Sequence, residues 1–269
     1  MTIEKRSIFQ AHPYHLVSPS PWPLFCSISL LALTTTSVSY FHSFKFSGYI
    51  VLFSLISLIT AMTLWFRDIS AEGSYEGNHT LAVQKGLNIG VALFIASEAL
   101  FFLAIFWAFF HSALSPTVEL GAHWPPMEIE SINPFELPLL NTVLLLASGT
   151  TVTYSHHSLI QGNRSGSLYG LIFTVILAFI FTVLQGLEYT VASYTISDSV
   201  FGSCFYFGTG FHGLHVIIGT IFLASSLLRL FLYLLSLNHH VGFESAIIYW
   251  HFVDVVWLAL YVSVYYWGS

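Results

Sequence analysis

The stretch from Leu81 to His111 constrains the fold most. It reads LAVQKGLNIGVALFIASEALFFLAIFWAFFH, and only one charged residue, Glu98, lies between Lys85 and His111. At about 1.5 Å per residue an α-helix of this length is roughly 46 Å long, whereas the hydrocarbon core of a bilayer is about 30 Å thick. The stretch therefore predicts a membrane-spanning helix that tilts or projects beyond the bilayer, with Glu98 near the midplane.

An acid at this depth costs about 3 kcal/mol on insertion scales, so it usually faces protein or water and marks a functional site. We interpret Glu98 as a buried membrane acid, either proton-related or structural. The simpler alternative is a hydrogen-bonded packing residue. Gly86 and Gly90 have the GxxxG spacing that lets a second helix approach closely, so we expect a packed seam there with Glu98 at its margin.

Composition places the chain among integral membrane proteins. Of its 269 residues 55% are hydrophobic and only 7% are charged, against about 25% charged residues in soluble domains. No basic run is present to bind nucleic acid. Cys26 and Cys204 lie in apolar runs and form no metal or redox motif. The N-terminal residues resemble neither a signal peptide nor an Arg-rich presequence, which favours a bacterial membrane or synthesis inside an organelle.

Seven segments are long and apolar enough to span, which predicts an all-α integral membrane protein. The predicted spans are residues 22–41, 48–65, 81–111, 139–160, 167–189, 200–233 and 243–267.

The polar stretch RDISAEGSYEGNH interrupts the apolar pattern after the second span. We expect a single transmembrane domain, residues 1–269, with helices one and two in residues 1–66. An inner-side loop is expected at 67–80, and helices three to seven at 81–269. No internal repeat is visible, so an inverted-repeat transporter gains no support.

The basic residues predict the orientation, because they accumulate on the inner side of a membrane. The chain has seven lysines and arginines. If it spans the membrane seven times, six of these basic residues fall on the side of the N-terminus and only Lys45 falls on the other side. The six are Lys5, Arg6, Arg67, Lys85, Arg164 and Arg229. The N-terminus is therefore expected on the cytoplasmic or matrix side, and the C-terminus on the outer side.

The histidines suggest metal or haem ligands, because imidazole is a common ligand. His212 and His215 are three residues apart, and His156, His157, His239 and His240 lie near predicted span ends. Most of these histidines lie near the membrane boundaries, where an imidazole can form hydrogen bonds with loops, lipid headgroups or water. We therefore expect no metal site. His251 and Asp254, one turn apart, are expected to form a polar packing pair.

A second group of polar and aromatic residues is a candidate phospholipid site. Basic residues between helices on the inner side can hold lipid headgroups, and tryptophans favour membrane interfaces. The candidates are Trp65, Arg67, Glu72, His79, Trp107, His215 and Arg229. Ordinary snorkelling and solvation of the loop is the competing interpretation.

Several ordered motifs resemble the cytochrome c oxidase subunit III family, of the mitochondrial type. They are HPYHLVSPSPWPL (12–24), WFRDI (65–69), NHTLAVQKG (78–86), SEALFFLAIFWAFFHSALSP (97–116), WPP (124–126), ELPLLNT (136–142), TYSHHSLI (153–160), TISD (195–198), GTGFHGLHVIIG (208–219), and NHHVGFE through HFVDVVWLALYVSVYYWGS (238–269). The similarity covers nearly the whole chain.

The resemblance implies seven helices, with helices one and two separated from helices three to seven by a V-shaped, lipid-holding cleft. It implies a core subunit with no active site, no haem and no copper of its own. The haem and copper belong to partner subunits I and II, and small accessory subunits and a complex III supercomplex are further implied partners. The implied role is to support electron transfer from cytochrome c to oxygen, proton uptake and pumping, in the mitochondrial inner membrane, with the N-terminus in the matrix and the C-terminus in the intermembrane space.

The resemblance also aligns individual residues. Glu98 matches the buried acid of helix three. Arg67, Glu72, His79, His215 and Arg229 match positions near the cleft lipids. Ala71 stands where many animal members carry a second basic residue beside the equivalent of Glu72, which leaves one headgroup contact unmatched.

Two other functions remain as alternatives. A proton-coupled transporter would use Glu98 with the His251–Asp254 pair. A membrane cytochrome would use His212 or His251 as axial haem ligands.

Overall fold

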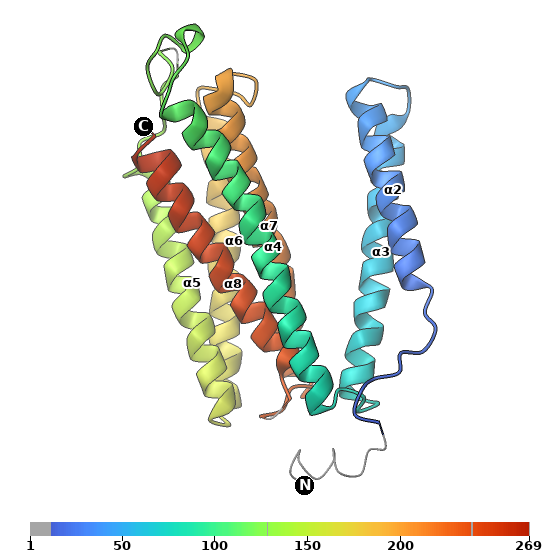
Figure 1. The fold of residues 1–269 in the computed structure, drawn as a ribbon. Coiled ribbons are helices and arrows are strands. Elements are labelled where there is room, and N and C mark those ends of the chain that lie inside the picture. Colours follow the sequence, from blue (N-terminus) through green and yellow to red (C-terminus); the bar gives the residue numbers. More distant parts are fainter. Residues whose placement is uncertain (1–11, 128, 238, 269) are drawn as a thin grey trace. The chain divides into compact units, whose positions relative to one another are not determined.

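The fold is built from membrane-spanning helices (Figure 1), in a computed structural model that describes residues 12–127, 129–237 and 239–268. Lys5 and Arg6, two of the basic residues used to predict the orientation, lie outside this range. Among the described residues seven helices are long and apolar enough to cross a membrane, which confirms the predicted all-α membrane fold. They are α2 (Trp22–Phe41), α3 (Ser47–Ser74), α4 (Leu81–Ala113), α5 (Leu137–Ile160), α6 (Arg164–Val191), α7 (Ser199–Phe231) and α8 (Val241–Leu260), with a 3₁₀ turn η1 (Val118–Leu120) and a closing π-helical segment η2 (Tyr261–Tyr266).

The main departure from the predicted boundaries is at the end of the second span. That span was expected to end near Trp65, with a loop from residue 67, but α3 continues to Ser74. Residues 67–72 include four polar residues but neither glycine nor proline, so they favour no helix end. The change from apolar to polar residues predicts where the bilayer ends, whereas the backbone remains helical beyond it.

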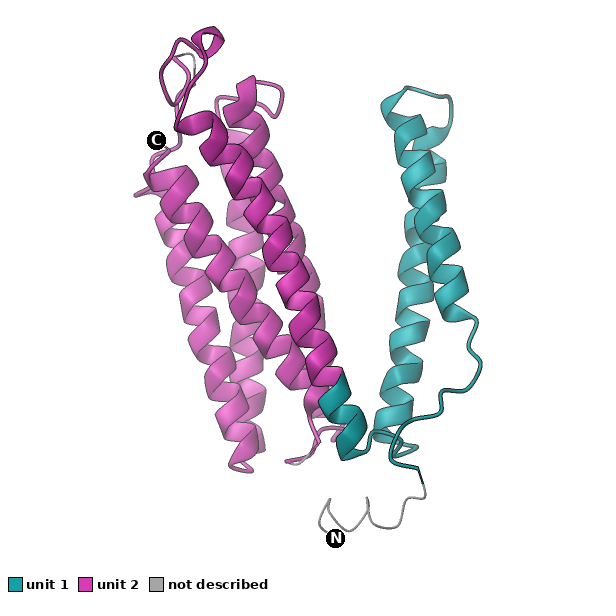
Figure 2. Ribbon diagram, in the orientation of Figure 1, with its two compact units in different colours: residues 1–86 teal, residues 87–269 magenta. Residues whose placement is uncertain are grey.

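The chain divides into two compact units (Figure 2), residues 1–86 and residues 87–269. In unit 1, α2 and α3 are joined by a tight turn in which Ser43 and Phe46 adopt positive φ. The buried residues of α3 are Ser47, Ser54 and Ala61. They are spaced seven apart and share one face of the helix, so small side chains form the contact of this helix pair.

A close helix contact of the GxxxG type in unit 2 is made by Gly166 and Gly170 of α6, rather than by Gly90. A Cβ atom at Gly170 would lie 2.8 Å from Cβ of Ser155 and 3.0 Å from the carbonyl oxygen of Thr151, both on α5. Among the described residues no atom lies within 4 Å of a Cβ placed at Gly86 or Gly90. The seam expected at Gly86 and Gly90 is therefore not formed within the described part of this chain, where both glycines lie on an open helix face.

Two tryptophans of α8 fix this helix against α5. The Nε1 atom of Trp250 donates to Oγ of Ser148, and that of Trp257 donates to Oγ1 of Thr142, each at 2.9 Å. Both indoles are fully buried. Since the tryptophans are seven residues apart, they lie on one face of α8. Each indole thus buries a large apolar surface and also satisfies its polar group.

Candidate functional site

Glu98 of α4 and His215 of α7 form a hydrogen-bonded pair within unit 2. The Oε2 atom of Glu98 lies 3.0 Å from Nε2 of His215. The Nδ1 atom of His215 lies 2.6 Å from the carbonyl oxygen of Phe211, one turn earlier on α7. The imidazole also stacks on Tyr249 and meets the edge of Phe102. The side chains of His215 and Glu98 are 10% and 24% exposed, so protein covers most of both.

The bonding pattern requires a shared proton in this pair. A carbonyl oxygen only accepts, so Nδ1 of His215 must carry a hydrogen. If the imidazole is neutral, Nε2 is then an acceptor and the Glu98 carboxyl must be protonated to donate to it. If the imidazole is charged, Nε2 donates to the carboxylate. In both forms one exchangeable proton lies between Glu98 and His215, near the centre of a membrane helix.

His212 lies in a different environment from His215. Its ring is fully buried between Phe181 and Trp257, with ring centroids 5.8 and 5.1 Å away. Its Nε2 atom is 3.2 Å from the carbonyl oxygen of Val253. The two histidines therefore do not share a centre. Aromatic rings enclose His212, and both nitrogens of His215 are bonded, so neither fits an axial position of a haem.

His251 and Asp254 lie together at the contact between α8 and α5. The Nδ1 atom of His251 is 3.7 Å from Oδ2 of Asp254, longer than a direct hydrogen bond. The Nε2 atom of His251 is 3.2 Å from Oγ1 of Thr153. A Cβ at Gly149 would lie 2.7 Å from Oδ2 of Asp254. Glycine is thus the residue that leaves room for the carboxyl group here.

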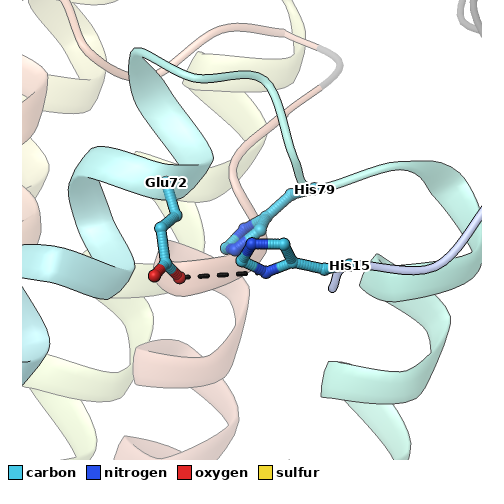
Figure 3. Close-up of side chains that lie close together, drawn as sticks. All are labelled: His15, Glu72 and His79. Atoms are coloured by element: carbon cyan, nitrogen blue, oxygen red, sulfur yellow. Dashed lines mark ion pairs between the residues drawn. The ribbon is translucent and has the colours of Figure 1, made fainter. Parts of the chain in front are cut away.

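In unit 1, Glu72 near the end of α3 faces two histidines (Figure 3). The Oε2 atom of Glu72 lies 3.9 Å from Nδ1 of His15, and the rings of His15 and His79 meet edge to face at 6.3 Å. A Cβ at Gly73 would lie 2.7 Å from Nδ1 of His79, so this imidazole rests on the bare backbone of α3. Thr80 donates to the carbonyl oxygen of Pro13, which ties the N-terminal segment to the loop.

Arg67 and Trp65 are the exposed members of the candidate lipid group in unit 1. The side chain of Arg67 is 64% exposed and bonds Oδ1 of Asp68 at 2.8 Å. The other oxygen of Asp68 accepts from Nε1 of Trp22. Trp65 is 37% exposed. A guanidinium and an indole, both accessible, therefore lie two residues apart near the polar end of α3.

The remaining candidates, Trp107 and Arg229, are in unit 2. Trp107 of α4 is 73% exposed. Arg229 in the last turns of α7 extends to the start of α8, where a Cβ at Gly242 would lie 3.1 Å from its Nη1 atom. The guanidinium is thus held beside the α8 N-terminus.

The sequence analysis missed a buried acid, Glu188, near the end of α6. This side chain is 1% exposed. Its Oε1 atom accepts from the Tyr265 hydroxyl at 2.5 Å and from Nε2 of Gln185 at 3.0 Å, while the Gln185 carbonyl oxygen lies 3.4 Å from Nδ2 of Asn141. The signal was the polar pair Gln185 and Glu188, three apart in an apolar helix, which places both on one face.

Comparison with known proteins decides the family. A sequence model described as cytochrome c oxidase subunit III matches residues 12–269. The chain belongs to the cytochrome c oxidase subunit III family. It is 69% identical to cytochrome c oxidase subunit 3 of Podospora anserina and 68% identical to that of Neurospora crassa, each over 100% of both chains. The protein of Yarrowia lipolytica is 58% identical, over 100% of this chain and 99% of its own.

Membership in the subunit III family confirms the resemblance seen in the motifs. The chain is thus an accessory subunit of an oxidoreductase of the respiratory chain, complex IV, and it forms a complex with other oxidase subunits. It is a multi-pass membrane protein with seven spans in the described residues.

Proposed function

We propose that this subunit stabilises the catalytic subunit, holds phospholipids and sustains proton uptake during turnover, without an active site of its own. The Glu98–His215 pair supports the proposal, because an exchangeable proton lies between the two side chains and Glu98 is in the middle of the long apolar helix α4. The haem and copper centres are assigned to subunits I and II, since His212 and His215 do not fit a haem. We assign the chain to the mitochondrial inner membrane, with the N-terminus in the matrix and the C-terminus in the intermembrane space.

Small accessory subunits, and association with complex III, complete the proposed set of protein partners. The long lipid-facing helices support this, because many large apolar side chains remain exposed on them, including Trp107 and Phe53. In a membrane such faces contact lipid or neighbouring subunits.

The phospholipids are assigned to the polar ends of these helices. The exposed guanidinium of Arg67 suits a lipid phosphate, because it offers paired N–H donors. Glu72, with His15 and His79, suits the ammonium or hydroxyl of a headgroup, which would donate to the carboxylate. Trp65 is placed to pack on the acyl chain. In unit 2, Trp107 and Arg229 are assigned the same roles, while His215 is assigned to Glu98.

The functional test is Glu98→Gln in the intact oxidase. We expect full assembly, a full haem spectrum and an initial rate of electron transfer near that of the parent complex. The activity that remains after many turnovers is expected to fall, because the glutamine amide binds His215 without an ionisable proton. Loss of haem from the assembled complex would place this chain in the catalytic centre and contradict the proposal.

The lipid assignment has its own test. Arg67→Gln is compared with Lys85→Gln, which removes an exposed basic residue that is outside the candidate lipid group. Phospholipid retained by each purified complex is counted by mass spectrometry. The Arg67 variant is expected to retain less phospholipid than the parent, and the Lys85 variant the same amount. Equal retention in both variants would remove Arg67 from the lipid site.

A further inference from the structure

A cluster of two imidazoles and one carboxylate lies where α5 ends and α8 begins. His156 belongs to the last turns of α5, His240 precedes α8 and Glu244 lies in its first turn. One ligand atom from each residue lies within 4.8 Å of the other two. His156 and His240 are far apart in sequence, so spacing along the chain did not predict this cluster. All three belong to unit 2.

The ring of His240 is oriented as in a metal-binding histidine. Its Nδ1 atom lies 3.0 Å from the carbonyl oxygen of Ser236, which only accepts, so Nδ1 carries the hydrogen. The second nitrogen, Nε2, then presents a lone pair 3.2 Å from Oε1 of Glu244. A backbone carbonyl that fixes the tautomer through the other ring nitrogen is a recurrent feature of histidine metal ligands. His240 itself is only 8% exposed.

The nitrogens that face this point are not satisfied by the protein. Within the described part of the chain, neither Nε2 of His156 nor Nε2 of His240 has a hydrogen-bond partner, although both atoms are buried. The ring of His156 is held by the edge of Phe243, at 5.8 Å, and by the ring of His240, at 5.5 Å. Unlike the other unpartnered buried atoms of the described residues, these two converge with a carboxylate oxygen of Glu244, so both are available to one ligand at that point.

A proton alone does not satisfy the cluster. A charged His240 would pair with the Glu244 carboxylate but would leave the Nε2 atom of His156 with no partner. A divalent ion binds both imidazoles and the carboxylate together. At Zn–N distances of about 2.0–2.1 Å, two ligand atoms of a tetrahedral site are about 3.3 Å apart, close to the His240–Glu244 distance.

We propose that His156, His240 and Glu244 bind a divalent transition-metal ion of the Zn²⁺ type. Two imidazoles and one carboxylate are a recurrent zinc ligand set that leaves one coordination position for water. In the similar group of unit 1, His15, Glu72 and His79, the carboxylate lies farther from its imidazole, at 3.9 Å between Glu72 and His15 against 3.2 Å between Glu244 and His240. That group is assigned to the lipid headgroup.

The test uses the purified, intact oxidase equilibrated with Zn²⁺ in a metal buffer. Zinc bound per complex is measured by elemental mass spectrometry, and its position by anomalous diffraction at the zinc edge. We expect anomalous density between the three side chains. Glu244→Gln and His156→Gln are expected to lower zinc affinity at this site at least tenfold, while His157→Gln leaves it unchanged. His157 is the matched control, because it is the adjacent histidine and is exposed.

Two results would overturn the proposal. In the first, the parent complex binds zinc at other positions and shows no anomalous density at the three side chains. The cluster would then be an ion pair between a protonated His240 and Glu244. The other is an equal zinc affinity in Glu244→Gln and His157→Gln. Glu244 is partly exposed, at 36% for its side chain, so its glutamine variant keeps the measurement available if His156→Gln does not assemble. Neither result changes the assignment of the chain as an oxidase subunit.

Discussion

The Oε2 atom of Glu98 lies 3.0 Å from the Nε2 atom of His215. This contact links the only acid of α4 to α7. His215 is in turn fixed by the carbonyl oxygen of Phe211. The hydrogen-bond partner of this intramembrane acid is therefore a residue of the same chain. This is expected, because lipid acyl chains offer no hydrogen-bond partner.

This pair predicts different stabilities for two substitutions of Glu98. Glu98→Gln keeps a donor for Nε2 of His215, so thermal stability of the purified complex should be close to that of the parent. Glu98→Ala leaves a partly buried nitrogen without its partner, at a cost of about 1–3 kcal/mol. Thermal unfolding followed by tryptophan fluorescence compares the two. An equal loss in both variants would contradict this prediction, because it would show that the glutamine amide does not replace the carboxyl group as the partner of His215.

The glycines of α4 and α6 predict opposite responses to alanine. Gly170→Ala forces a Cβ to within 3 Å of Ser155, and overpacking of this kind costs about 1–3 kcal/mol. Gly90→Ala meets open space in the described structure, and alanine favours the helix. The first variant should lower the unfolding temperature and the second should not. A loss for Gly90→Ala alone would indicate that a partner subunit packs at Gly90.

We expect the complex to be less stable when the acceptor oxygens of Glu188 are removed. Glu188→Ala leaves the Tyr265 hydroxyl and the Gln185 amide buried with no acceptor, each at a cost of about 1–3 kcal/mol. Glu188→Gln keeps one carbonyl oxygen and should lose less. Yield of assembled complex and its unfolding temperature measure the difference. Glu136→Ala, an acid at the exposed start of α5, is the control and should behave as the parent.

Tyr194 lies in the connection between α6 and α7. We expect it to make the stability of the fold depend on pH in the alkaline range. Burial raises the pKa of Tyr194 well above its ordinary value. Its protonated form therefore stabilises the fold fully below about pH 10, the ordinary tyrosine pKa, and this stabilisation is lost as the pH rises further. The hydroxyl has no hydrogen-bond partner among the described residues, so Tyr194→Phe should preserve stability at pH 7.

The measurement for Tyr194 is the unfolding temperature of parent and variant complexes from pH 8 to 11. The variant should lose less stability than the parent above about pH 10. Parallel curves over this range would contradict the assignment. Tyr14, an exposed tyrosine, provides the matched control as Tyr14→Phe.

The sequence by itself determined the seven spans, the membrane class and the family. A span is a property of consecutive residues, because the length of an apolar run is compared directly with the thickness of a bilayer. Boundaries such as Trp22–Phe41 therefore agree with the structure. The ordered motifs determined the family in the same way, since they lie along the chain. The start of the polar region near Arg67 did not determine where α3 ends.

Only the tertiary structure decided which residues face one another. The GxxxG spacing occurs at both Gly86–Gly90 and Gly166–Gly170, and the structure packs the second pair closely. It also gave Glu98 its partner His215, buried Glu188 and brought His156 to His240. These contacts join residues that are distant in sequence. They depend on the rotation and axial register of each helix in the bundle, and periodicity along one nearly uniformly apolar helix cannot specify either.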